Sequence, residues 1–342
     1  MKPAPLFADH SRLRYQALIG VGGIGAGTFF RLQGNETLGR EESRAGRFLD
    51  QRDYCKLHII AHNAGALLGP SFPVIPLGRV GDDETGRRIV AEMQTAGMDV
   101  RYVETCPGEQ TMYSICFQYP DGTGGNLTTE DSACCRVDAA FVERARPDFR
   151  RYRGRGVALA APETPLESRA ALLRLATEHG FFRAASFTSL EVPVAMEMGL
   201  FRESDLLALN RSEAESVLRV GPGALEPHDL AARTVERLSG EYPRLRVSVT
   251  AGASGSWFWD TSGMHFTAAL QVPVRNSAGA GDAHLGALLA GIIAGLGSAD
   301  AHRLAGVVAS YSVTSPHTIH PDLDAGSLRE FAAQTHTTLP AG

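Results

Sequence analysis

The sequence predicts an α/β protein in which a largely parallel sheet is covered by helices on both faces and accompanied by a small β-flap. Short apolar segments bounded by glycine, proline or polar residues alternate with longer segments of helical periodicity over most of the chain. Two polar, glycine-bearing stretches, residues 28–52 and 102–129, break this alternation and are expected to form the flap. Because no linker or internal repeat divides the chain, residues 1–342 are expected to form a single domain.

The individual elements follow from the spacing of the apolar residues. The clearest is a helix over residues 282–296, where Leu285, Leu288, Leu289 and Ile292 lie on one face. Further helices are expected at residues 54–68, 85–96, 166–178, 211–218, 229–238 and 299–313. Strands are expected at residues 16–21, 73–77, 112–119, 157–160, 206–209 and 245–250.

Composition excludes several classes of protein. Hydrophobic residues make up 44% of the chain and the net charge is −5, without a long basic run, so no nucleic-acid partner is expected. No window contains 18 consecutive apolar residues and the N-terminus lacks a signal-peptide core, so we expect a cytoplasmic protein with no membrane partner. Five cysteines without a CxxC pair argue against a disulfide framework and against zinc.

The strongest functional signal is the glycine-rich segment from Asn276 to Asp282, which reads NSAGAGD and directly precedes the apolar-faced helix. Backbone N–H groups at a helix N-terminus bind anions, and the glycines let a phosphate approach closely. Gly279, Ala280 and Gly281 are therefore candidates for an anion-binding turn, and Asp282 for a base that removes the proton of an attacking alcohol. The alternative is an ordinary glycine turn in which Asp282 caps the helix.

Two more segments follow apolar strands. Asn210 and Glu213 either organise a hydrated Mg²⁺ near phosphates or form a capping box at a helix start. Thr250, Gly252 and Gly255 lie in a turn of small residues that either accommodates a flat ligand or simply connects a strand to a hairpin.

Two glycine-bearing stretches have alternative explanations. Residues 80–86, VGDDETG, are typical of a capped helix start with acidic residues at the positive end of the dipole. Residues 20–25, GVGGIG, fit the dinucleotide fingerprint of nicotinamide enzymes. However, a long helix and a second buried strand ending in an acid should follow that fingerprint, and residues 34–47 are instead charged and turn-like.

In this order and spacing, the segments at residues 80–86, 210–213, 250–255 and 278–282 resemble the ribokinase-like (PfkB) family of carbohydrate and nucleoside kinases. The resemblance implies a ribokinase-like fold in which the flap is a β-lid over the substrate, with a homodimer through the lid as one possible assembly. It implies ATP as phosphate donor, Asp282 as base and residues 279–281 as the anion hole. It also implies that Asn210, Glu213, Thr250, Gly252 and Gly255 bind the nucleotide, with Glu213 acting on Mg²⁺ through water.

The chain departs from this family mainly in its substrate half. Asn276-Ser277 replaces the usual Asp-Thr, which makes activation by a monovalent cation doubtful. Residues 20–27 lack the acid that binds substrate hydroxyls in relatives, which leaves Gly23 and Gly25 as candidates for substrate contact. Counting back from the end of the first helix places Lys56 at a glycine position of the family, where it either reads an anionic group of the substrate or is a solvated helix residue.

These observations favour an ATP-dependent kinase that phosphorylates a hydroxyl of a small sugar-like or nucleoside-like molecule. A ligand-binding relative that has lost catalysis is the first alternative, because the substrate half is altered while Asp282 and its turn are intact. A nicotinamide-dependent dehydrogenase is the second, and it rests on residues 20–25 alone.

Overall fold

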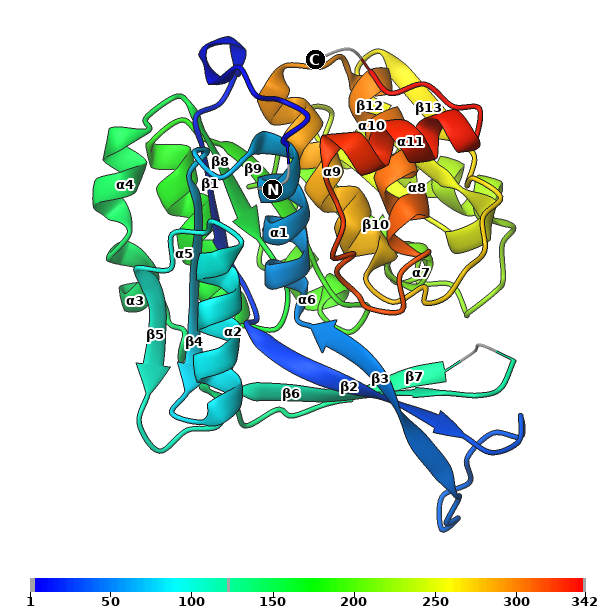
Figure 1. The fold of residues 1–342 in the computed structure, drawn as a ribbon. Helices are drawn as coiled ribbons and strands as arrows, with labels where there is room; N and C mark the ends of the chain where they lie inside the picture. Colours follow the sequence, from blue (N-terminus) through cyan, green and yellow to red (C-terminus); the bar gives the residue numbers. More distant parts are fainter. Residues whose placement is uncertain (1–3, 122–123, 341–342) are drawn as a thin grey trace.

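The computed structural model describes residues 4–121 and 124–340 and contains two sheets (Figure 1). The large sheet has nine strands in the order β13-β12-β11-β10-β9-β8-β1-β4-β5, parallel from β5 to β11 and closed at the other edge by an antiparallel hairpin. Its strands are β1 (Ala17–Val21), β4 (Val74–Gly81), β5 (Tyr102–Cys106), β8 (Gly156–Ala160), β9 (Phe182–Ser186), β10 (Leu206–Asn210), β11 (Arg246–Thr250), β12 (Ser256–Asp260) and β13 (Gly263–Thr267).

Helices cover both faces of this sheet, as the sequence predicts. Successive residues of a strand point to opposite faces, so Leu18 of β1 joins one apolar core and Ile19 joins the other. The first core is closed by α1 (Lys56–Leu68), α2 (Glu84–Thr95), α9 (Ala280–Ala294), α10 (Ser298–Ser312) and α11 (Ala325–Gln334). The second is closed by α3 (Ala139–Glu143), α4 (Arg146–Arg151), α5 (Leu166–Glu178), α6 (Val192–Glu197), α7 (Arg211–Leu218) and α8 (Pro227–Glu241).

The small sheet has the strand order β3-β2-β6-β7 and extends across the bottom of the view in Figure 1. It consists of β2 (Gly25–Leu32), β3 (Gly46–Tyr54), β6 (Met112–Gln118) and β7 (Gly124–Thr128). The two stretches that interrupt the strand–helix alternation therefore meet in one sheet. The stretch 102–129 is divided, however, because β5 pairs with β4 in the large sheet.

The connection after β1 decides whether residues 20–25 are a dinucleotide fingerprint. β1 ends at Val21 and the chain enters β2 at Gly25, so no helix follows the glycine-rich segment 20–25. The dinucleotide fingerprint requires that helix, and the dehydrogenase alternative therefore loses its structural basis.

Within residues 4–121 and 124–340, no helix is both long and apolar enough to cross a lipid bilayer.

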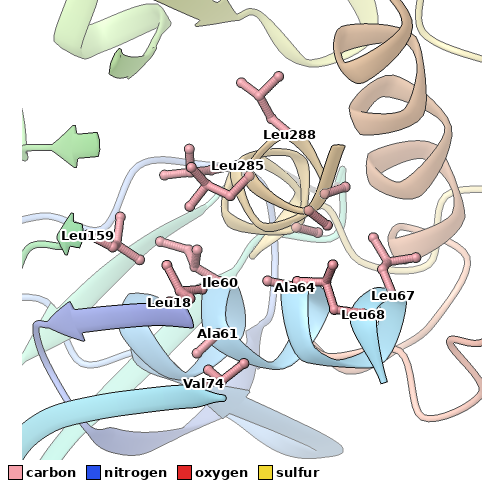
Figure 2. Close-up of a cluster of buried hydrophobic side chains, with 14 of the residues drawn as sticks. Leu18, Ile60, Ala61, Ala64, Leu67, Leu68, Val74, Leu159, Leu285 and Leu288 are labelled. Atoms are coloured by element: carbon pink, nitrogen blue, oxygen red, sulfur yellow. The ribbon is translucent and has the colours of Figure 1, made fainter. Parts of the chain in front are cut away.

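Helices α1 and α9 pack closely, and this contact determines where their N-termini lie. Ile60 and Ala64 of α1 and Leu285 of α9 belong to the same apolar core, where Leu285 lies toward Ile60 (Figure 2). A Cβ added at Gly286 of α9 would lie 2.6 Å from the carbonyl oxygen of Ile60, so the two helices approach at a distance that only glycine permits. Their N-termini, which carry Lys56 and Asp282, consequently open into the same cavity.

Candidate functional site

A cavity of about 920 Å³ lies at the carboxyl ends of β10 and β11, where open parallel sheets commonly bind ligands. It is bounded by the N-termini of α1, α7 and α9 and by α10. Most of the residues singled out from the sequence line it: Lys56, Asn210, Glu213, Thr250, Gly252, Gly255, Gly279, Ala280, Gly281 and Asp282. Segments more than 200 residues apart in the sequence thus form one site.

The glycine turn before α9 presents unpaired backbone donors to this cavity. Gly279 is the N-cap residue and has φ 79°, and no side chain caps the helix. The N–H of Ala280 donates to Ser277, whereas the N–H groups of Gly281 and Asp282 are first-turn donors, which have no partner inside a helix. Because Asp282 is the third residue of the helix, the alternative that it merely caps α9 is wrong.

The pKa of the Asp282 carboxyl group is shifted by burial and by two neighbouring charged side chains. Burial raises the pKa of Asp282, the Lys56 ammonium opposes that shift, and the nearby Asp53 carboxylate adds to it. A carboxyl group with a raised pKa is a better proton acceptor than an ordinary aspartate. The arrangement places a carboxyl group with a raised pKa beside the first-turn N–H groups of α9.

Lys56 faces the cavity from the first turn of α1. The negative charge of Asp282 is the main factor that raises the pKa of Lys56, and Glu163 and Glu213 contribute further, so the ammonium stays charged. In the described part of the chain, Lys56 nevertheless forms no direct ion pair. It is therefore available to bind an anion, and it is not the solvated surface residue of the alternative interpretation.

Asn210 and Glu213 form a complete capping box at the start of α7. The Asn210 side chain accepts from the N–H of Glu213 at 3.0 Å, and the Glu213 carboxylate accepts from the Asn210 backbone at 2.8 Å. The capping box, which the sequence offered as the alternative role of this pair, is therefore present. The carboxylate still borders the cavity, and burial raises the pKa of Glu213 to about 7.

The turn after β11 keeps its backbone open to the cavity. A Cβ at Gly252 would meet nothing within 4 Å, whereas one at Gly255, which has φ 93°, would lie 2.5 Å from the carbonyl oxygen of Thr267 on β13. Gly252 therefore leaves space in the cavity, and Gly255 permits the hairpin to close beside it. Residues 80–86 have the simpler role, because Asp83 caps α2 and also accepts from the backbone and hydroxyl of Thr111.

Gly23 and Gly25 do not line this cavity. A Cβ at Gly23 would lie 2.5 Å from the Glu163 side chain, and one at Gly25 would lie 2.4 Å from the carbonyl oxygen of Met112. Both glycines thus serve close packing at the junction of β1, β2 and the small sheet.

Glu163 contacts the site through Lys56, and the sequence reasoning missed it. It follows β8, has φ 75°, and accepts a hydrogen bond from the backbone N–H of Lys56 at 3.1 Å. Burial raises its pKa, and the charge of Lys56 opposes the shift. An acid three residues after an apolar strand was the available signal, because such residues gather at the carboxyl edge of a parallel sheet.

Asn276 closes the loop in front of the anion turn. Its side-chain oxygen accepts from the N–H of Ala278 and its amide donates to the carbonyl oxygen of Pro316, both at 3.0 Å. The amide donor therefore engages the carbonyl oxygen of Pro316, and Asn276 brings no negative charge to this loop.

The chain matches the model of pfkB family carbohydrate kinases over residues 61–325. The chain is 28% identical over 241 residues to a 2-dehydro-3-deoxygluconokinase from Thermoproteus tenax, covering 64% of this chain and 67% of that protein. It is 29% identical over 123 residues to the uncharacterized sugar kinase YegV of Escherichia coli K12, covering 36% and 37% of the two chains.

Solved structures share the fold at low identity. A ribokinase from Cryptococcus neoformans in complex with ADP superimposes with a TM-score of 0.78 at 19% identity, covering 92% of this chain and 99% of that one. A nucleoside kinase from Burkholderia thailandensis in complex with inosine gives 0.73 at 16%, covering 95% and 100%. A ribokinase from Arabidopsis thaliana complexed with ribose and ATP gives 0.70 at 17%, covering 93% and 98%. The fold is accordingly ribokinase-like, as the sequence resemblance implied.

Proposed function

The chain belongs to the pfkB family of carbohydrate kinases, and we propose that it transfers the γ-phosphoryl group of ATP to a hydroxyl of a small sugar-like or nucleoside-like acceptor. The observation that carries the proposal is the meeting of Asp282, the free N–H groups of the first turn of α9 and Lys56 in one cavity. A base, an anion-binding turn and a fixed positive charge are the parts that phosphoryl transfer requires.

Each group has a defined task in this reaction. Asp282 removes the proton of the acceptor hydroxyl, and the oxygen attacks the γ-phosphorus. The bond from that phosphorus to the bridging oxygen of ADP breaks, so a phosphate ester and ADP result. The N–H groups of Gly281 and Asp282 bind the negative charge on the transferred group, and Gly279 and Ala280 shape the turn. Thr250, Gly252 and Gly255 border the nucleotide.

The residues fit Mg²⁺ held mainly by phosphates and water. In the described part of the chain, no group of three or more His, Cys, Asp or Glu side chains could hold a metal alone. Mg²⁺ keeps several waters and commonly binds through substrate phosphates, and when bound it would neutralise phosphate charge. Glu213, fixed by Asn210 at the cavity, would act on its water ligands.

Replacing Glu213 by glutamine is expected to raise the Mg²⁺ concentration needed for half-maximal activity, because the variant loses the charge that orders the water ligands. Glutamine also forms a capping box, so α7 should remain intact. The measurement is a magnesium titration of ADP release, with exposed Glu236→Gln of α8 as control. Potassium should change activity little, because Asn276 provides no charge. An unchanged Mg²⁺ requirement, or strong potassium activation, would contradict these assignments.

The charges around Lys56 favour a neutral polyhydroxylated acceptor. Asp282, Glu163 and Glu213 all act on this single ammonium, so its positive charge is already partly offset before an acceptor binds. A sugar acid is the second candidate, because one relative is named a 2-dehydro-3-deoxygluconokinase and Lys56 forms no ion pair in the described chain. We keep both acceptor classes and distinguish them by experiment.

The test of the proposed reaction is ATP-dependent ADP release with Mg²⁺ and a panel that includes D-ribose, inosine and 2-dehydro-3-deoxygluconate. Release that depends on one acceptor supports the proposal, and the phosphorylated product should appear in equal amount. A protein that binds an acceptor, as a ligand-dependent rise in Tm would show, but releases no ADP is instead a silent ligand-binding relative.

Replacing Lys56 by alanine tests the sugar-acid candidate. If Lys56 reads an anionic group of the acceptor, the substitution should raise KM for 2-dehydro-3-deoxygluconate and leave KM for ATP nearly unchanged, as loss of uniform binding predicts. Steady-state kinetics with each substrate varied in turn provides the measurement. An unaltered acceptor KM, or a preferred acceptor without negative charge, excludes this candidate.

The small sheet is the surface we propose for a homodimer. Phe48, Ile115 and Leu127 are exposed on it, with Phe48 67% and Leu127 63% accessible. Apolar side chains in a contiguous exposed patch commonly mark a protein contact. Sedimentation velocity would show the assembly, and Phe48→Ser should shift it toward the monomer.

A further inference from the structure

Asp53 is a buried carboxylate that the reaction scheme above does not use. It lies near the end of β3, two residues before the N-cap of α1, and its exposed fraction is 7%. The side chain thus lies between the small sheet and the segment that carries Lys56. An ionised carboxylate is costly to bury unless hydrogen bonds or opposite charges compensate, so its position calls for an explanation.

The Asp53 side chain reaches across β2 to contact β6. Asp53 pairs with Gly27 of β2, and its Oδ2 accepts from the Ser114 hydroxyl of β6 at 2.7 Å. The Cys116 thiol of β6 donates to the same oxygen at 3.3 Å. A Cβ at Gly27 would lie 2.4 Å from Oδ2, so the carboxylate reaches β6 only because glycine leaves the surface of β2 open.

The Ser114 hydroxyl and the Cys116 thiol are both neutral, and both donate to the same oxygen of Asp53, Oδ2. Among the described residues Asp53 forms no ion pair, and no hydrogen bond occupies its Oδ1. The charge also acts on the reaction centre, since it contributes to the raised pKa of the base Asp282. A residue that only joined strands of the small sheet would not need a charge, because a serine or asparagine could accept from Ser114 equally well.

We propose that Asp53 binds hydroxyl groups of the acceptor from the side of the small sheet through its Oδ1, which is free among the described residues. A carboxylate only accepts hydrogen bonds, which selects hydroxyl groups and disfavours an acceptor with a carboxylate of its own. The inference rests on the proposed kinase function and specifies its acceptor as a neutral polyol, such as a pentose or the ribose of a nucleoside.

The test compares Asp53→Asn with Ser114→Ala. Asparagine can keep the hydrogen bond from Ser114 but loses the charge, whereas Ser114→Ala keeps the carboxylate and removes the bond within the sheet. For D-ribose or inosine, whichever supports ADP release, Asp53→Asn should raise the acceptor KM roughly 10- to 100-fold, the range for hydrogen bonds to charged groups. KM for ATP should change less than about 2-fold, and Ser114→Ala should resemble the wild type.

A second readout separates this inference from the proposed reaction. Calorimetric titration of the same acceptor should show weaker binding to Asp53→Asn and unchanged binding to Ser114→Ala, whether or not phosphate is transferred. Binding without ADP release in the wild type would refute the kinase function and leave the role of Asp53 standing. Equal acceptor binding by Asp53→Asn and wild type, equal losses in both variants, or no binding of either acceptor to the wild type would each overturn the inference.

Discussion

Asp282→Asn is expected to lower kcat roughly 10²–10⁴-fold, the range for the loss of a general base. The substitution preserves size and shape and removes the only carboxylate on the first turn of α9. Binding of ATP should change little, because the backbone donors of Gly281 and Asp282 remain. Stopped-flow or coupled measurement of ADP release gives kcat, and calorimetric titration of ATP gives the affinity.

The pH profile provides the matching control for Asp282. The base must be deprotonated to act, so kcat/KM should fall as pH decreases through its raised pKa, at higher pH than for an ordinary aspartate. That acid limb should be lost in Asp282→Asn and kept in Asp300→Asn, which changes an acid of α10 that is paired with Arg303 outside the cavity. Near-normal turnover of Asp282→Asn would refute its assignment as base.

The sequence was sufficient to identify residues whose roles depend on local structure. A strand, a small-residue turn and a helix start can be read within about ten residues, and this located Asn210, Thr250 and the turn at residues 279–281. The caps at Asn210 and Asp83 were predictable as well, because each depends on contacts within a few residues, and both caps are present. Strands β1, β4, β8, β10 and β11 of the large sheet were predictable for the same reason.

Residues whose roles depend on distant partners were harder to predict. Asp53 acquires a role only because β3 pairs with Gly27 and reaches β6, and neither pairing has a signature in the sequence around residue 53. Lys56 could be read as a solvated residue until the packing of α1 on α9 fixed its direction. Strand β9, the edge hairpin β12–β13 and helices α3, α4, α6 and α11 were missed because they are short or weakly patterned.

Gly281→Val is expected to reduce kcat/KM by at least roughly 10³-fold while leaving a folded protein. A Cβ at Gly281 would have no contact nearer than 3.8 Å, and that contact is the Thr250 hydroxyl across the cavity. A Cβ therefore has room there without backbone strain, and the branched valine side chain would occupy the space between α9 and β11 that a transferred phosphate needs. Gly279 is unsuitable for this test, because its φ of 79° would strain any substitute.

Gly240→Val provides the matched control for this prediction. Gly240 lies near the end of α8, away from the cavity, and a Cβ there also meets nothing within 4 Å. Both variants should keep a Tm close to that of the wild type, since valine in a helix is no less favourable than glycine. Only Gly281→Val should lose activity and the ATP-dependent increase in Tm. A fully active Gly281→Val enzyme would mean that this turn does not face the transferred phosphate, and the free N–H groups of α9 would then need another explanation.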